Sequence, residues 1–247
     1  MSALADGIAA HLSVVDAERQ RRAGLPGLPA RVTELKAFQQ RRFALTYADL
    51  LASTRYGAAA RYFLAELYGP GDFTTRDAQF ARVAPAIARL FPDEVAETVV
   101  ILAELHALSE TLDTETALLL PNGPVAPIDY VRAWQGVGRA PERERQIELT
   151  LQIAAQLDRV TRKPMLRNAL RLMRGPARAA GLAEVQRSLE AGFDVFRAMK
   201  GAQEFIALID ARERAVAASL FAAGHGAGDP SMQRVLAELP APMADRG

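Results

Sequence analysis

The sequence has 247 residues, of which 50% are hydrophobic and 24% are charged, and its formal net charge is +1. A chain of this length buries enough apolar surface to fold as one large or two small globular domains. Because it contains no cysteine, disulfide scaffolds, cysteine–zinc sites, iron–sulfur clusters and thiol nucleophiles are excluded, and the near-zero net charge provides no overall field toward nucleic acid or membranes.

Apolar residues recur at spacings of three and four along almost the whole chain, which predicts an all-α fold. Glycine and proline mark the ends of the helices. We expect a multi-helix bundle of about nine to eleven helices.

In the first half, glycine and proline separate five predicted helices. Pro85 is expected to kink the fourth of them, and Pro121-Asn122-Gly123-Pro124 forms the strongest break in the chain. The predicted helices cover residues 4–23, 29–53, 56–68, 74–90 and 93–119.

The second half begins with a short helix and contains one long one, which Pro164 is expected to kink or divide. The predicted helices cover residues 128–135, 142–174, 182–199 and 202–223, with a last short helix that ends near residue 239. The central break suggests two packed helical halves, residues 1–120 and 128–240, followed by a frayed tail over residues 241–247. A single bundle is the alternative.

Aromatic residues concentrate between residues 38 and 80, which hold nine of the sixteen in the chain. Tyrosine supplies a ring with a polar end, so Tyr47, Tyr62, Phe63 and Tyr68 are candidates for the lining of a pocket for a flat or apolar ligand. The favoured interpretation is that these rings pack as core between helices.

Residues 63–77 of this region read FLAELYGPGDFTTRD. This segment resembles the F-L-x-E-L-Y-G-P-x-D-F-x-x-R-D pattern of an uncharacterised bacterial all-helical family, a domain of unknown function. The resemblance implies a helical fold and no particular activity. The segment itself is typical of a helix end, a tight Gly-Pro-Gly corner and a new helix start.

Charges are segregated along the chain. Between Arg89 and Arg132 there is no arginine or lysine but eight acidic residues, and between Asp158 and Glu184 there are seven basic residues and no acidic one. If the long helix continues past Pro164, four of the basic residues form a stripe about 80° wide on one face. These anion-binding candidates are Lys163, Arg167, Arg171 and Arg174.

Three interpretations of the basic stripe remain open. Arginine forks suit phosphates and carboxylates, so the stripe is a candidate site for a nucleotide, RNA or an acidic partner. It is equally suited to an anionic membrane surface, with Met165, Leu166, Leu170 and Met173 beneath it. The favoured interpretation is that the basic and acidic stretches of this chain neutralise each other. Nucleic acid is disfavoured because no aromatic residue interleaves the stripe.

His106 lies near the apolar side of the helix predicted over residues 93–119, with Glu110 one turn farther on. A histidine in this setting can bind haem iron or a metal, but it is more often held by a carboxylate four residues away. Haem is therefore an alternative cofactor for the aromatic region and His106, and no other cofactor and no metal site are predicted.

Motifs for catalysis are absent: the sequence has no H-E-x-x-H, no G-x-S-x-G, no phosphate loop and no G-x-G-x-x-G. We therefore expect a non-catalytic binding or interaction protein, with a pocket protein for haem or another flat apolar ligand, or an enzyme without a recognisable motif, as alternatives. Neither a signal peptide nor a stretch long enough to span a membrane is evident, so a cytoplasmic location is expected. The dominance of arginine over lysine suggests a bacterial genome rich in G and C. A protein partner or a small apolar ligand is expected, and the sequence leaves the oligomeric state open.

Overall fold

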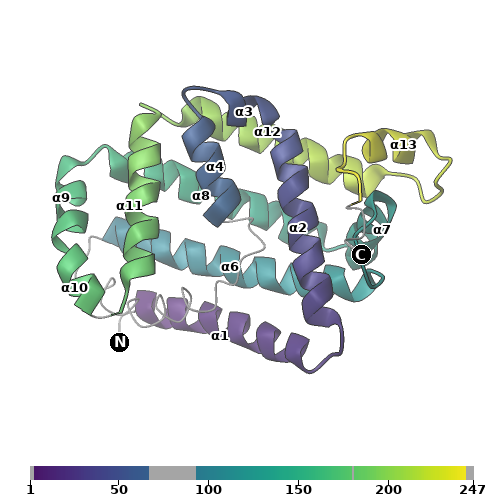
Figure 1. Ribbon diagram of the computed structural model, residues 1–247, viewed down its shortest axis with the longest axis horizontal. Coiled ribbons are helices and arrows are strands. Elements are labelled where there is room, and N and C mark those ends of the chain that lie inside the picture. Colours follow the sequence, from purple (N-terminus) through teal and green to yellow (C-terminus); the bar gives the residue numbers. More distant parts are fainter. Residues whose placement is uncertain (1–2, 67–92, 180, 243–247) are drawn as a thin grey trace.

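The computed structural model describes residues 3–66, 93–179 and 181–242, which form helices joined by short loops and no strand (Figure 1). The predicted all-α multi-helix bundle is confirmed. The helices are α1 (Ala3–Ala23), α2 (Leu28–Thr46), α3 (Ala48–Ala52), α4 (Gly57–Glu66), α6 (Asp93–Leu119), α7 (Pro127–Val137), α8 (Ala140–Thr161), α9 (Pro164–Leu172), α10 (Arg174–Ala179), α11 (Ala183–Ala198), α12 (Gln203–Ala222) and α13 (Pro230–Ala237). The helix predicted over residues 74–90 lies outside the described residues.

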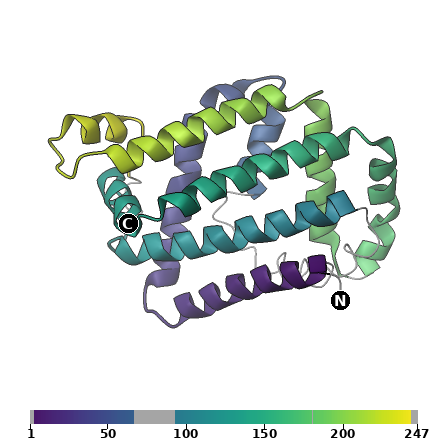
Figure 2. The same ribbon diagram turned by 180° about the vertical axis from the view of Figure 1, so that it is seen from behind.

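Two layers of helices build the molecule. Helices α1, α6, α8 and α12 lie side by side and form one layer, which faces the viewer in Figure 2. Helices α2, α4 and α11 cross this layer on its other face, in front in Figure 1. Such layers are stable because each helix buries its apolar stripe against a neighbouring element.

The core consists of two large apolar clusters. One lies around α2, α7 and the C-terminal half of α12, and includes Leu35 and Trp134. The other lies around α4, α11 and the N-terminal half of α12, and includes Tyr47 and Phe205. Both clusters contain residues from before and after the break at residues 121–124. Residues of both predicted halves thus build each cluster. The division of the chain into two packed halves stays a prediction.

Proline and a buried tyrosine divide two helices that the sequence pattern joins. Pro164 separates α8 from α9, because the residue before a proline avoids the helical conformation and Lys163 is extended there (φ −90°, ψ 105°). The helix predicted over residues 29–53 was wrong as a single element: α2 ends at Thr46 and α3 begins at Ala48. Tyr47 between them leaves the helical conformation, and its ring lies buried in the second cluster.

Candidate functional site

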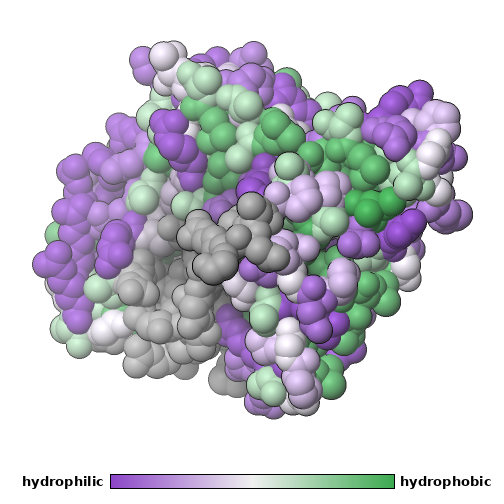
Figure 3. Space-filling view, turned by 45° about the vertical axis from the view of Figure 1, so that its right-hand side comes forward, coloured by the Kyte–Doolittle hydropathy of each residue, from purple (hydrophilic) through white to green (hydrophobic). Residues whose placement is uncertain are grey.

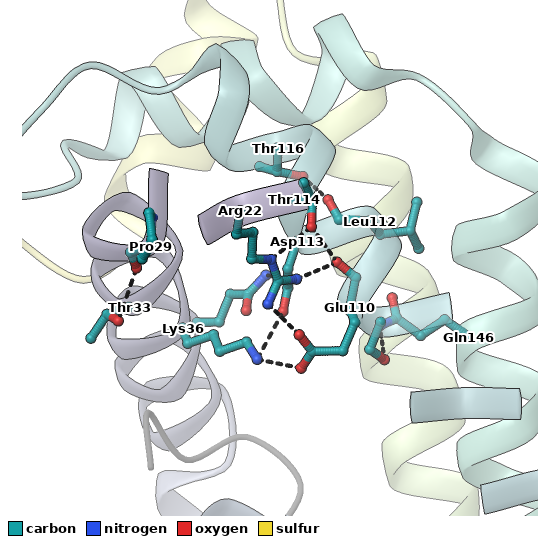
Figure 4. A network of polar contacts seen from close by, with 12 residues as sticks. Arg22, Pro29, Thr33, Lys36, Glu110, Leu112, Asp113, Thr114, Thr116 and Gln146 are labelled. Atoms are coloured by element: carbon teal, nitrogen blue, oxygen red, sulfur yellow. Dashed lines mark hydrogen bonds and ion pairs between the residues drawn. The ribbon is translucent and has the colours of Figure 1, made fainter. Parts of the chain in front are cut away.

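Buried charged side chains gather where α1, α2 and α6 meet (Figure 4). Glu110 of α6 is only 4% exposed, and its two carboxylate oxygens accept hydrogen bonds from Arg22 of α1 and Lys36 of α2. Arg22 also donates through Nε to the hydroxyl of Thr114 at 2.8 Å and to the backbone carbonyl of Glu110. One arginine thus fixes the end of α1 against α6.

The electrostatic surroundings keep Glu110 ionised. Burial by itself would raise the pKa of this carboxyl, but the charges of Lys36 and Arg22 outweigh it and lower the pKa to about 2. A carboxylate of this acidity is a poor proton acceptor near neutral pH, because a general base works best with a pKa near the operating pH. Glu110 is therefore suited to holding helices together and not to proton transfer.

The pKa of Asp113, one turn farther along α6, is shifted in the opposite direction. Burial raises its pKa, and the nearby charge of Glu110 adds to this effect although Lys36 opposes it. Its Oδ1 accepts a hydrogen bond from the side-chain amide of Gln39 at 3.0 Å, and Lys36 Nζ lies 4.0 Å from its Oδ2. Glu110 and Asp113 thus share Lys36, whose ammonium group lies closer to the carboxylate of Glu110.

A buried arginine stacks on the single tryptophan of the chain. The guanidinium carbon of Arg143, on α8, lies 3.9 Å from the ring centroid of Trp134, on α7. Arg143 donates to the hydroxyl of Thr116 at 2.9 Å, and burial lowers its pKa. This cation–π contact joins α7 and α8 to α6 without an acidic partner in hydrogen-bond contact.

Of the aromatic candidates, the structure brings three together. Tyr47 and Phe63 are buried in the second core cluster, and the rings of Tyr62 and Phe63 meet edge to face at 6.3 Å. Phe63 also contacts the rings of Phe196 and Phe205 from α11 and α12. These ring contacts are typical of core packing, and a pocket beside them stays a prediction. Tyr68 lies outside the described residues.

The hydroxyl groups of two of these tyrosines are bound within the fold. Tyr47 donates to Glu213 Oε1 at 2.9 Å, and the same oxygen accepts a hydrogen bond from Arg42 at 2.6 Å. Tyr62 donates to the backbone carbonyl of Ser188 at 3.1 Å. The polar ends of these rings thus connect α2 with α12 and α4 with α11.

His106 is half-buried on α6, one turn before Glu110. Both carboxylate oxygens of Glu110 bind Arg22 and Lys36, and His106 adds a smaller electrostatic effect that lowers the pKa of Glu110. Within the described residues, no group of three His, Asp or Glu side chains could hold a metal ion. Haem binding stays a prediction, which absorption spectra of the haem-titrated protein would test.

The four anion-binding candidates do not share one helix. Lys163 precedes α9, Arg167 and Arg171 lie on α9, and Arg174 begins α10. The predicted stripe assumed a helix that continues past Pro164, and it is lost because the chain turns there.

Several residues of the charged stretches form ion pairs with other segments of the chain. Arg167 and Arg174 bind Asp194 and Glu190 of α11, at 2.9 and 2.7 Å. The described acidic residues of α6 that form ion pairs bind other segments, such as Glu104 with Arg145 at 2.9 Å. Among the described residues, the ion pairs of both stretches join them to other segments, and the pairing of the two stretches with each other stays a prediction.

Two aliphatic side chains project from α9 into solvent. Met165 is 83% exposed and Leu172 is 79% exposed, whereas Leu166, Leu170 and Met173 are half-buried. Seven residues span almost two helical turns, so Met165 and Leu172 lie on the same face of α9. The exposure of Leu172 was not predicted, because the sequence pattern places this residue inside a longer helix, although its spacing of seven residues from Met165 is visible in the sequence.

A shallow groove of about 310 Å³ lies between α2, α12 and α13. Its walls include Leu45, Val216 and Leu239, and hydrophobic residues gather on this side of the molecule in Figure 3. None of the described aromatic candidates lines this groove.

A family described as "Domain of unknown function (DUF8198)" matches residues 18–227, which is most of the chain. The chain belongs to this family. Membership of DUF8198 agrees with the expected helical domain of unknown function and assigns no activity. No curated protein and no solved structure matches the chain.

In the part of this DUF8198 member that the structure describes, no helix is both long enough and apolar enough to cross a bilayer.

Proposed function

We propose that this protein is a non-catalytic binding protein that holds an anionic partner at the end of the molecule formed by α9, α10 and α11. The observation that carries the proposal is a local excess of positive charge. Residues 159–200 contain ten basic and three acidic residues, although the net charge of the whole chain is only +1. We call the exposed basic side chains of α9, α10 and α11 the basic surface: Arg171, Arg174, Arg178, Arg187 and Arg197.

Ion pairs within the fold use only part of this charge. Arg174 is bound to Glu190, and Arg171 adds a smaller electrostatic effect that lowers the pKa of Glu190, but Arg171, Arg178 and Arg187 are exposed and form no ion pair among the described residues. Arginine keeps its charge at all relevant pH values and binds carboxylates and phosphates through two parallel hydrogen bonds. Several such groups at one end of a nearly neutral protein favour an anionic partner.

Binding of a soluble polyanion tests this proposal. We expect the protein to bind fluorescent poly-L-glutamate with an affinity that falls steeply as sodium chloride is raised. Replacement of Arg171, Arg178 and Arg187 by glutamine should weaken this binding by about tenfold or more, since each contact that is lost removes part of the electrostatic free energy. Fluorescence anisotropy at several salt concentrations measures both effects.

The matched control removes three exposed arginines from other helices. Arg21, Arg132 and Arg234 lie on α1, α7 and α13, and replacing them by glutamine changes the net charge by the same amount. This control should bind poly-L-glutamate nearly as well as the unchanged protein. Equal losses in both triple variants would contradict the proposal, because overall charge and not the basic surface would then determine binding.

A further inference from the structure

The exposed aliphatic side chains of α9 are unusual in this molecule. Met165 and Leu172 are 83% and 79% exposed, whereas the next most exposed large hydrophobic residues of the described chain, Leu119 and Leu45, reach 53% and 51%. The more exposed pair lies on one face of a single helix, about 10 Å apart along its axis. An anionic partner bound by charge alone would leave this apolar surface in water.

Three exposed basic residues lie close in sequence to this apolar face. Lys163 precedes α9 directly, Arg171 is the neighbour of Leu172, and Arg178 follows on α10; all three side chains are exposed. Helix α9 also forms an outer edge of the molecule in both ribbon views (Figures 1 and 2). Among the described helices, α9 is therefore one of those placed at the periphery of the molecule.

The shape and composition of this face favour a lipid surface over a protein or a nucleic acid. The two aliphatic side chains protrude, so a protein partner would need a pocket for each, whereas the fluid boundary of a bilayer accepts such side chains without a preformed pocket. Residues 159–192 contain no aromatic side chain on which a nucleic-acid base could stack. Anionic headgroups are complementary to the neighbouring arginines.

We infer that α9 docks on the surface of an anionic phospholipid bilayer, with Met165 and Leu172 inserted at the boundary between headgroups and acyl chains and the neighbouring basic residues on the lipid phosphates. This inference rests on the proposed anion-binding role and names the partner of that same surface. The chain lies on the bilayer in this arrangement and does not cross it.

Vesicle co-sedimentation tests the inference. The protein should bind vesicles made of equal parts phosphatidylcholine and phosphatidylglycerol, and should not bind phosphatidylcholine vesicles. Replacing Met165 and Leu172 by serine should weaken binding to the mixed vesicles by about tenfold or more, because the inserted apolar surface is lost. The same variant should bind poly-L-glutamate unchanged, because its arginines remain.

A control variant replaces two other exposed leucines, Leu25 and Leu45, by serine. It should bind the mixed vesicles as well as the unchanged protein does. Because the chain has no cysteine, Met165→Cys also provides a single labelling site for an environment-sensitive dye. The emission of this dye should shift to the blue with mixed vesicles and stay unchanged with poly-L-glutamate.

The outcomes of the two binding assays distinguish the lipid inference from the proposed function. Binding of poly-L-glutamate without binding of mixed vesicles would overturn the lipid inference and point to an acidic protein, while the proposed function would stand. Vesicle binding that persists in the Met165→Ser, Leu172→Ser variant, or equal binding to phosphatidylcholine vesicles, would overturn the inference as well. Failure to bind either poly-L-glutamate or mixed vesicles would overturn both.

Discussion

Glu110 joins α1, α2 and α6 through its carboxylate. Its carboxylate receives a cation from each of the two other helices, at a position that is 4% exposed. A buried ion pair that loses one member leaves an uncompensated charge in a place of low polarity. Here Arg22 would lose its acidic partner, and Lys36 would keep only Asp113, whose Oδ2 lies 4.0 Å away.

We expect Glu110→Gln to lower the free energy of unfolding by about 3 kcal/mol at pH 7. The lowered pKa of Glu110, about 2 compared with an ordinary value of 4.5, means that the ionised form stabilises the native state. The stabilisation is complete above pH 4.5 and is lost as the pH falls toward 2. Urea denaturation of both proteins across this range measures the difference.

The control for Glu110 is Glu104→Gln. Glu104 pairs with Arg145, but its side chain is 29% exposed, so its loss should cost about 1 kcal/mol or less. Similar losses for Glu104→Gln and Glu110→Gln would show that burial does not strengthen the contact of Glu110.

In contrast to Glu110→Gln, Asp113→Asn should not lower the free energy of unfolding at pH 7. The raised pKa of Asp113 means that the native state binds its proton more tightly than the unfolded state does, so ionisation of this group destabilises the fold. The variant should therefore be at least as stable as the unchanged protein at pH 7, and its advantage should vanish below the ordinary pKa of 3.8. Asparagine still offers an oxygen to Gln39. A clear loss of stability at pH 7 would contradict this assignment.

At the scale of elements, local sequence signals predicted most helices and missed the contacts between them. Apolar spacing predicted helices close to α1, α6 and α12, and proline predicted the division between α8 and α9. The break at Tyr47 was not predictable, because it results from burial of this ring among helices distant in sequence. Local rules contain no information on such packing.

The composition of the basic surface was predictable from the sequence, and its geometry was not. The excess of arginine near residues 159–178 was evident from the sequence, but its ion pairs to α11 and the exposure of Leu172 follow from the turn at Pro164 and the packing of α9 on α11. Likewise, the sequence contains no signal that joins Arg22 to Glu110, because 88 residues separate them.

The whole molecule is expected to unfold as one unit. Both apolar clusters combine residues from before and after the break at residues 121–124, and neither half has a core of its own among these clusters. Fluorescence of Trp134, which is 8% exposed in the first cluster, should therefore follow the same denaturation curve as the helical circular dichroism signal. Two separate transitions would instead indicate two independent domains.

The concentration of arginine at one end gives the molecule an uneven distribution of charge. With a total charge of +1, an excess of seven basic residues over residues 159–200 leaves the remainder of the chain net negative. Such a molecule has a large electric dipole moment although it is almost neutral. It should adsorb to both cation and anion exchangers at low ionic strength, and a charged surface would orient it before contact is made.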